Sequence, residues 1–222
     1  TYVIPQFLAI ISDYNAFQTG LVIFWMGVPA FLLMPVLPFM IRRVDIRIAV
    51  GAGMLLMAVS CFVSTSLTAE SGGAVFTESQ LIRGVGMILA MMFLNQATVA
   101  SVAKDDAGDA SGIFNAARNL GGSFALAGLA SFQDQRTWHH SRRMEETLNA
   151  NSISLQSYLE SLAQNFGSMG EAMAVLGRTI QREAFIMTYN DVFFVMGMLT
   201  LITVPLVVFL KPLPKNVSLS MH

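Results

Sequence analysis

An arginine lies inside a stretch of sequence that is otherwise suited to lipid. Residues 110–132 read ASGIFNAARNLGGSFALAGLASF, and about 20 apolar or small residues are what an α-helix needs to cross a bilayer. Arg118 lies about eight residues into this run, about 12 Å deep at a rise of about 1.5 Å per residue. A cation facing lipid there would cost at least about 2.5–3.5 kcal/mol, so its side chain is expected to face protein or a water-filled path. The sequence therefore predicts a membrane-embedded chain with a polar interior at this helix.

The composition of the chain agrees with a membrane location. Of its 222 residues 54% are hydrophobic and 12% are charged, and the mean hydropathy is +0.59, which lies outside the range usual for soluble domains. Cys61 is the one cysteine, which excludes an intrachain disulfide and a cysteine metal cluster. We interpret it as a small hydrophobic residue.

Hydropathy divides the chain into one partial span, five complete spans, a long connection and a tail. The partial span covers residues 1–11, which are too few to cross a bilayer alone and begin abruptly without a methionine. We interpret them as the end of a longer helix whose first part is missing. The complete spans are 16–41, 48–67, 79–103, 110–132 and 192–210. The long connection is 133–191, and the tail is 211–222.

Basic residues in the short connections predict the orientation. Alternate connections, 12–15 and 66–78, contain neither Lys nor Arg. The remaining connections and the tail contain Arg42, Arg43, Arg47, Lys104, Lys211 and Lys215. Since Lys and Arg gather on the cytoplasmic side, the C-terminus is expected to be cytoplasmic. The connection 133–191 would then lie outside.

The long outer connection contains apolar residues near helical spacing. Leu155, Leu159, Leu162 and Phe166 can form one stripe of an amphipathic helix. One interpretation is a solvated hairpin that prolongs the flanking helices. The other is a docking surface for a second protein, because connections of this length are usually functional or disordered.

Two adjacent spans contain the polar residues that we expect to line a substrate cavity. Asn95 and Gln96 lie in 79–103, and Asn115, Arg118 and Asn119 lie in 110–132. Asn95 and Arg118 are expected at similar depth, so the two spans can share one polar layer. Hydrogen bonding between helices is an alternative role for the asparagines.

Other polar or special residues within the spans have simpler interpretations. Arg83 lies near the outer end of its span and is expected to extend to the interface. Pro29 and Pro35 are expected to bend the span 16–41. Small residues of the span 110–132 are expected to permit close helix approach on one face, namely Gly121, Ala125 and Gly128. The candidates for helix packing or gating are Pro29, Pro35, Gly121 and Gly122.

The sequence contains no pattern typical of an enzyme or a metal site. It has no Gly-rich phosphate loop, no HExxH and no plausible nucleophile and base. His139 and His140 are interpreted as a surface pair, because a metal ion would need further ligands nearby. We expect no catalytic residue, no bound metal or cofactor and no nucleic-acid partner.

The order of several motifs resembles one family of transporters. DYNAFQTGLVIF, IRRVDIR, LIRGVGMILAMMFLNQATVASV, GDASGIFNAARNLGGSFALA, RTWHHSRRMEETLN and YNDVFFVMGML followed by KPLPK appear in this order. Together they resemble the C-terminal half of a fourteen-span drug:proton antiporter of the EmrB/QacA type, in the major facilitator superfamily. The chain departs from the superfamily's loop signature at Pro38, where a Gly is expected, and at Arg42, where an Asp is expected.

The resemblance implies an all-α membrane protein with a long helical periplasmic loop. It further implies proton-driven export of drugs or other amphipathic compounds across a bacterial inner membrane, with the proton gradient as the energy source. The implied partners are the missing N-terminal half of the protein, a periplasmic adaptor and an outer-membrane channel. The proton-coupling acids of such antiporters lie mainly in that missing half.

Two other functions stay open at this point. The chain could belong to a carrier for one specific metabolite, lipid or siderophore, or to a polytopic membrane enzyme or scaffold. An enzyme should show buried catalytic groups within its spans, and the sequence shows none. Met87, Met91, Met92 and Phe93 favour promiscuous binding over recognition of one polar solute, although lipid-facing packing explains them almost as well.

Overall fold

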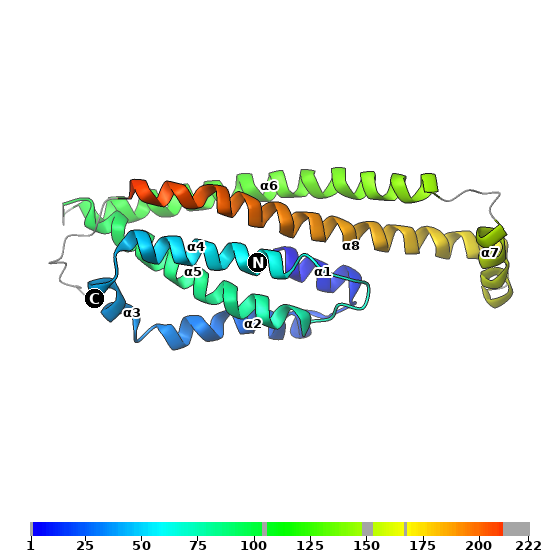
Figure 1. The fold of residues 1–222 in the computed structure, drawn as a ribbon, viewed down its shortest axis with the longest axis horizontal. Coiled ribbons are helices and arrows are strands. Elements are labelled where there is room, and N and C mark those ends of the chain that lie inside the picture. The colour runs from blue at the N-terminus through cyan, green and yellow to red at the C-terminus, as the bar shows by residue number, and fades with distance from the viewer. Residues whose placement is uncertain (1, 104–105, 148–152, 167, 211–222) are drawn as a thin grey trace.

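The computed structural model describes residues 2–103, 106–147, 153–166 and 168–210, which are helical apart from short connections. The elements are α1 (Val3–Ile11), α2 (Ala16–Leu33), α3 (Leu37–Arg43), α4 (Ile46–Val63), α5 (Val75–Ala100), α6 (Ala107–Thr147), α7 (Ile153–Phe166), α8 (Met169–Thr203) and the 3₁₀ helix η2 (Val204–Phe209). Helices α6 and α8 run side by side and project beyond a shorter bundle of α1, α2, α4 and α5 (Figure 1). We call the end from which they project the hairpin end.

Four helical segments are long and apolar enough to cross a membrane, among the residues that the structure describes. They are Ala16–Leu33, Ile46–Val63, Val75–Ala100 and Met169–Phe209. Helix α6 contains the whole predicted span 110–132 but is not one of the four. Its polar residues and glycines lower its apolarity, so its membrane crossing stays a prediction.

The predicted span 16–41 is divided into two helices. α2 begins with a capping box, in which Asn15 Oδ1 accepts a hydrogen bond from the Gln18 amide at 2.9 Å. It continues through Pro29, which is buried, and ends at Leu33, and α3 begins at Leu37 after a turn. Pro35 lies in this turn and has no amide hydrogen to continue the helix. The bend therefore lies near residues 34–36.

Glycines let α5 approach its neighbours closely. A Cβ atom on Gly53 of α4 would lie 2.7 Å from the carbonyl oxygen of Gly86 on α5. A Cβ atom on Gly84 would clash with the Met26 carbonyl of α2. α5 is therefore held between α2 and α4 at distances that only glycine permits there.

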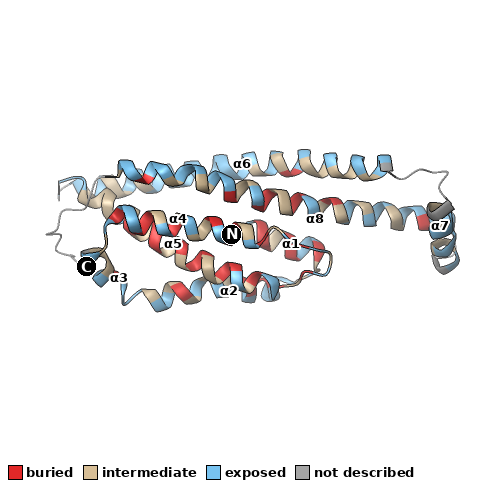
Figure 2. Ribbon diagram, in the orientation of Figure 1, coloured by how far each residue is buried: buried red, intermediate tan, exposed pale blue. Residues whose placement is uncertain are grey.

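The core lies in two clusters at opposite ends of the bundle (Figure 2). At the hairpin end, the Phe7 ring of α1 makes edge contacts with the rings of Phe76 and Tyr189, at centroid distances of 5.5 and 5.3 Å. At the other end, Phe93 of α5 and Val50 of α4 are buried in the second cluster. Helix α6, in contrast, is exposed along most of its length.

The long connection 133–191 is helical over most of its described residues. α6 continues to Thr147, and α8 begins at Met169 after Ser168, whose hydroxyl accepts a hydrogen bond from the Glu171 amide. This is the hairpin of the first interpretation, in which the flanking helices are prolonged. Helix α7 packs against α8, and Leu155, Leu159 and Leu162 are half-buried. The side chain of Phe166, the last residue of the predicted stripe, lies outside the described residues.

Candidate functional site

The predicted polar layer opens onto the surface of this chain. Asn95 of α5 is exposed, and so are Asn115, Arg118 and Asn119 of α6, whereas Gln96 is half-buried. The structure joins none of these five side chains to another by a hydrogen bond or ion pair within the described residues. The layer is therefore not closed within the chain, and the cavity-lining role of the five residues stays a prediction.

A cavity of about 560 Å³ lies between the end of α5 and the start of α6. Thr98 and Ser101 line it from α5, and Phe114 and Ala117 line it from α6. Two carboxylates, Asp106 and Asp109, also lie along it. Arg118 follows the last of these lining residues, so it lies near the cavity without being part of its wall.

Arg83 is buried inside the bundle, and the prediction that it extends to the interface is wrong. Its exposed fraction is 7%. The Nε atom donates a hydrogen bond to Ser60 Oγ of α4 at 3.1 Å, and Nη2 lies 3.9 Å from Cys61 Sγ. The guanidinium also lies over the Phe193 ring of α8, 5.9 Å from its centroid. The close approach of α4 and α5 encloses the side chain before it can reach the interface.

No carboxylate lies within ion-pair distance of Arg83 among the described residues, so its charge is balanced by dipoles and a ring. The Ser60 hydroxyl in turn donates to the Ser79 carbonyl at 2.8 Å. One turn before Arg83, the Gln80 side chain is buried and its Oε1 atom has no hydrogen-bond partner. A buried cation of this kind in a membrane helix is more often functional than structural.

An apolar groove of about 670 Å³ runs between α6 and α8 at the N-terminal end of α1. Gly122 and Gly128 line it from α6, and Val195 and Leu199 line it from α8. A Cβ atom on Gly121 or Gly122 would meet no described atom within 4 Å. The small residues of α6 therefore leave space here, and their packing role stays a prediction.

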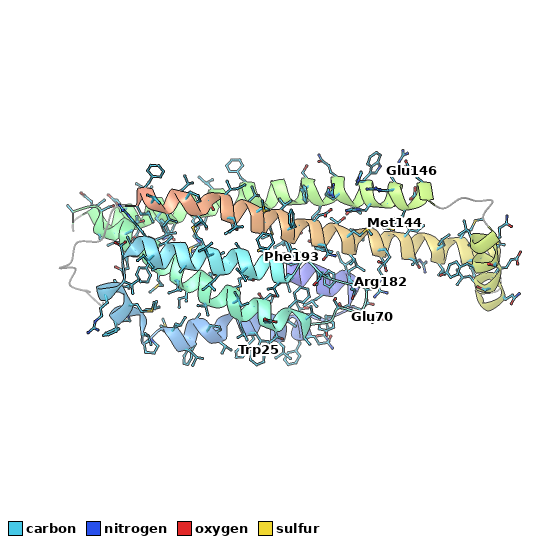
Figure 3. All side chains as sticks on the ribbon, viewed as in Figure 1. Trp25, Glu70, Met144, Glu146, Arg182 and Phe193 are labelled. Atoms are coloured by element: carbon cyan, nitrogen blue, oxygen red, sulfur yellow. The ribbon has the colours of Figure 1, made fainter. Side chains whose placement is uncertain are left out.

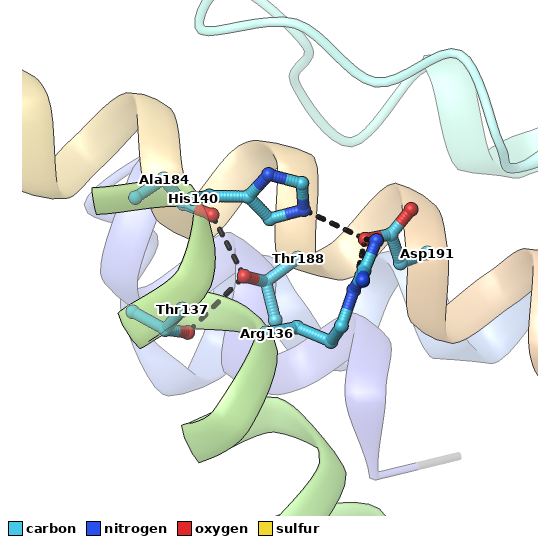
Figure 4. A network of polar contacts seen from close by, with 6 residues as sticks. All are labelled: Arg136, Thr137, His140, Ala184, Thr188 and Asp191. Carbon is cyan, nitrogen blue, oxygen red and sulfur yellow. Dashed lines mark hydrogen bonds and ion pairs between the residues drawn. The ribbon is translucent and has the colours of Figure 1, made fainter. Parts of the chain in front are cut away.

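A polar network joins α6 to α8 at the hairpin end (Figure 4). Asp191 Oδ2 accepts hydrogen bonds from Arg136 Nε and His140 Nε2, both at 2.7 Å. Arg136 Nη2 lies 2.6 Å from the same oxygen. The Thr137 and Thr188 hydroxyls are 3.1 Å apart. The interpretation of the two histidines as a surface pair therefore fails for His140, which is partly buried and bonded to α8, whereas His139 is exposed.

α8 is also hydrogen-bonded to the bundle at this end. Arg182, which is labelled in Figure 3, donates through Nη2 to the carbonyl oxygens of Ile11 and Ala69, at 3.0 and 3.1 Å. The Asn190 side chain accepts from the Leu67 amide and donates to its carbonyl, at 2.9 and 3.1 Å. The C-terminal end of α1 and the loop between α4 and α5 are thus held against one helix.

Comparison with known protein families gives a match to the N-terminal part of the sequence. The model of the Major Facilitator Superfamily matches residues 1–126, which is more than half of the chain.

The chain belongs to the Major Facilitator Superfamily.

The curated proteins whose sequences are similar to this superfamily member are named for resistance and export. The colistin resistance protein EmrB of Acinetobacter baumannii is 26% identical over 94% of the chain, and the multidrug export protein EmrB of Haemophilus influenzae is 28% identical over the same share. The fatty acid resistance protein FarB of Neisseria gonorrhoeae is 23% identical over 94%. The chain spans 42, 41 and 41% of the lengths of these relatives. The resemblance to the EmrB branch is thereby confirmed.

Sequence reasoning missed two features of this superfamily member. Arg83 stands beside Gly84 and Gly86, and this spacing indicates close helix packing that could have predicted its burial. Asp191 is the last residue before an apolar span. Nothing in the sequence indicates that it meets Arg136 and His140, which precede it by more than 50 residues.

Proposed function

We propose that the protein containing this chain is a proton-driven exporter of drugs or other amphipathic toxic compounds. The observation that supports this most strongly is similarity along 94% of the chain to proteins named for colistin resistance, fatty acid resistance and multidrug export. The energy source in this proposal is the proton gradient, with no bound cofactor. Catalytic groups play no part in it.

The substrate cavity in this proposal is lined by Asn95, Gln96, Asn115, Arg118 and Asn119, and the rest of the protein completes it. The exposure of all but Gln96 on this chain supports the proposal, because polar side chains on membrane helices need protein or water to face. Pro29 and Pro35 would let α2 and α3 bend during transport, and the exposed glycines Gly121 and Gly122 would accept a neighbouring helix.

The proposed setting is the inner membrane of a bacterium, with the C-terminus in the cytoplasm. The distribution of Lys and Arg among the connections supports this orientation. The proposed partners are the N-terminal half of the same protein, a periplasmic adaptor and an outer-membrane channel. The hairpin supports the adaptor, since α6, α7 and α8 extend well beyond the bundle (Figure 1).

Arg118→Ala tests the proposed cavity. We expect normal insertion and expression but loss of resistance to exported compounds, measured as growth in drug and as dye efflux. Arg118→Lys should restore little, because an ammonium group cannot replace the planar guanidinium fork. Arg143→Ala, at an exposed position of the hairpin, is the matched control and should transport normally. Normal efflux by Arg118→Ala would refute the role of Arg118.

A carrier for one specific metabolite, lipid or siderophore is the second candidate. The names of two relatives, fatty acid resistance protein FarB and cephamycin export protein CmcT of Amycolatopsis lactamdurans, each give one class of compound. A panel of cationic, neutral and anionic amphipathic compounds distinguishes the two candidates. Export of one class alone would favour the specific carrier.

A further inference from the structure

We propose that Arg136, His140 and Asp191 form a proton-responsive clamp between α6 and α8. All three nitrogen atoms, Arg136 Nε and Nη2 and His140 Nε2, converge on the same Oδ2 atom within 2.6–2.7 Å. The cluster lies where the two helices leave the bundle. Asn190, the neighbour of Asp191 on α8, is hydrogen-bonded there to Leu67 of the loop between α4 and α5. The inference depends on this geometry and is independent of what the protein exports.

Protonation of His140 would change the strength of this clamp. Histidine is the side chain that ordinarily gains or loses its charge between about pH 5 and about pH 8. A neutral ring can donate one hydrogen bond to the Asp191 carboxylate, whereas a protonated ring adds an attraction between two opposite charges. Acidic conditions should therefore tighten the contact between the helices.

The charged and titratable groups near His140 come from α6 and α8. On its own helix, Arg136 binds the same carboxylate, and the ring of His139 lies 5.6 Å away. On α8, Asp191 faces it directly, and Arg182 is directed to the carbonyl oxygens of Ile11 and Ala69. Glu183 lies two turns from Asp191 along α8. The carboxylate of Asp191 is thus the group that responds to the charge on His140.

The clamp acts on α6 more than on α8. α8 is held to the bundle through Arg182 and Asn190, whose contacts do not involve His140. α6 is held at this level through Arg136, His140 and the hydroxyl contact of Thr137. A change of charge on His140 should therefore shift α6 relative to a fixed α8.

Distance measurements between spin labels test the clamp in the full-length protein. The labels replace Glu146 of α6 and Thr179 of α8, both exposed on the hairpin. Cys61 is buried, and the unsubstituted protein controls for labelling there. Between about pH 5 and about pH 8, the ratio of close to separated populations should fall by up to about fivefold, as expected when a partly exposed ion pair loses one charge while its hydrogen bond stays.

Three variants make the result decisive. His140→Gln keeps a hydrogen-bond donor without a titrating charge and should give the same distances at every pH. His139→Gln, the matched control, should keep the pH response of the natural protein. Asp191→Asn should abolish the response and favour the separated population. A wild-type distance distribution that does not change with pH, or a response that persists in His140→Gln, would overturn the proposal.

Discussion

Arg83 shows how much one buried side chain depends on its neighbours. Its guanidinium contacts Ser60 and the Phe193 ring, which come from two other helices, so three helices meet at one cation. Dispersed dipoles balance a charge less well than a carboxylate does. Burying such a charge costs free energy, so its presence indicates that a function requires it. The residue therefore has properties of a site rather than of a packing element.

Arg83→Leu separates these two roles. A well-packed apolar side chain in place of a buried charge often leaves stability unchanged or raises it. We expect a melting temperature in detergent equal to or above that of the natural protein, together with reduced efflux. Equal efflux in vesicles would show that Arg83 is structural. Arg43→Leu, at an exposed position, serves as the control.

At the scale of helices, glycines decide which pairs approach closely. Gly84 faces the Met26 carbonyl with no room for a methyl group, whereas Gly122 faces open space in this chain. The same substitution should therefore have opposite effects at the two positions.

Gly84→Ala should destabilise the protein by roughly 1–3 kcal/mol, since it forces α2 and α5 apart. Gly122→Ala should be neutral or slightly stabilising where Gly122 faces open space, as it does in this chain, because alanine favours the helix. Destabilisation by this variant would instead support the proposed packing of a neighbouring helix on Gly122. Thermal unfolding of the two variants side by side measures the difference. An unchanged melting temperature for Gly84→Ala would contradict the described packing of α2 on α5.

The helical hairpin is the second element with a testable role. Replacing residues 151–170 by a flexible linker of equal length removes α7 and leaves both arms. If α7 contributes to adaptor docking, the adaptor should no longer co-purify, while transport across the inner membrane continues. Unchanged co-purification would indicate that α7 serves to cover α8, against which it packs.

The sequence predicted helices well and their contacts poorly. Apolar runs such as Ile46–Val63 indicate a membrane helix by length alone. The break near Pro35 was predicted only as a bend, because proline can kink a helix or end it. The burial of Arg83 and the convergence on Asp191 depend on how separate helices are aligned, which local patterns do not encode. The side chains of Asn115, Arg118 and Asn119 are exposed, so no contact within the described residues defines their role.

At the scale of the whole molecule, the orientation is the property that a labelling experiment tests directly. Asp45 lies in an arginine-containing connection, and Glu160 lies on α7. With cysteine at either position, a membrane-impermeant reagent applied to intact cells should label position 160 but label position 45 only after permeabilisation. This follows from the excess of cations in the connections predicted to be cytoplasmic. Labelling of position 45 alone would reverse the topology.

The continuity of α8 has a mechanical consequence. From Asp191 to Met169 the helix continues without a break, which at a rise of about 1.5 Å per residue makes an arm about 33 Å long. Tilting such a rod by about ten degrees at its base displaces its tip by about 6 Å, roughly one helical turn. A small rocking of the bundle would thus be magnified into a stroke large enough to reposition anything seated at the tip.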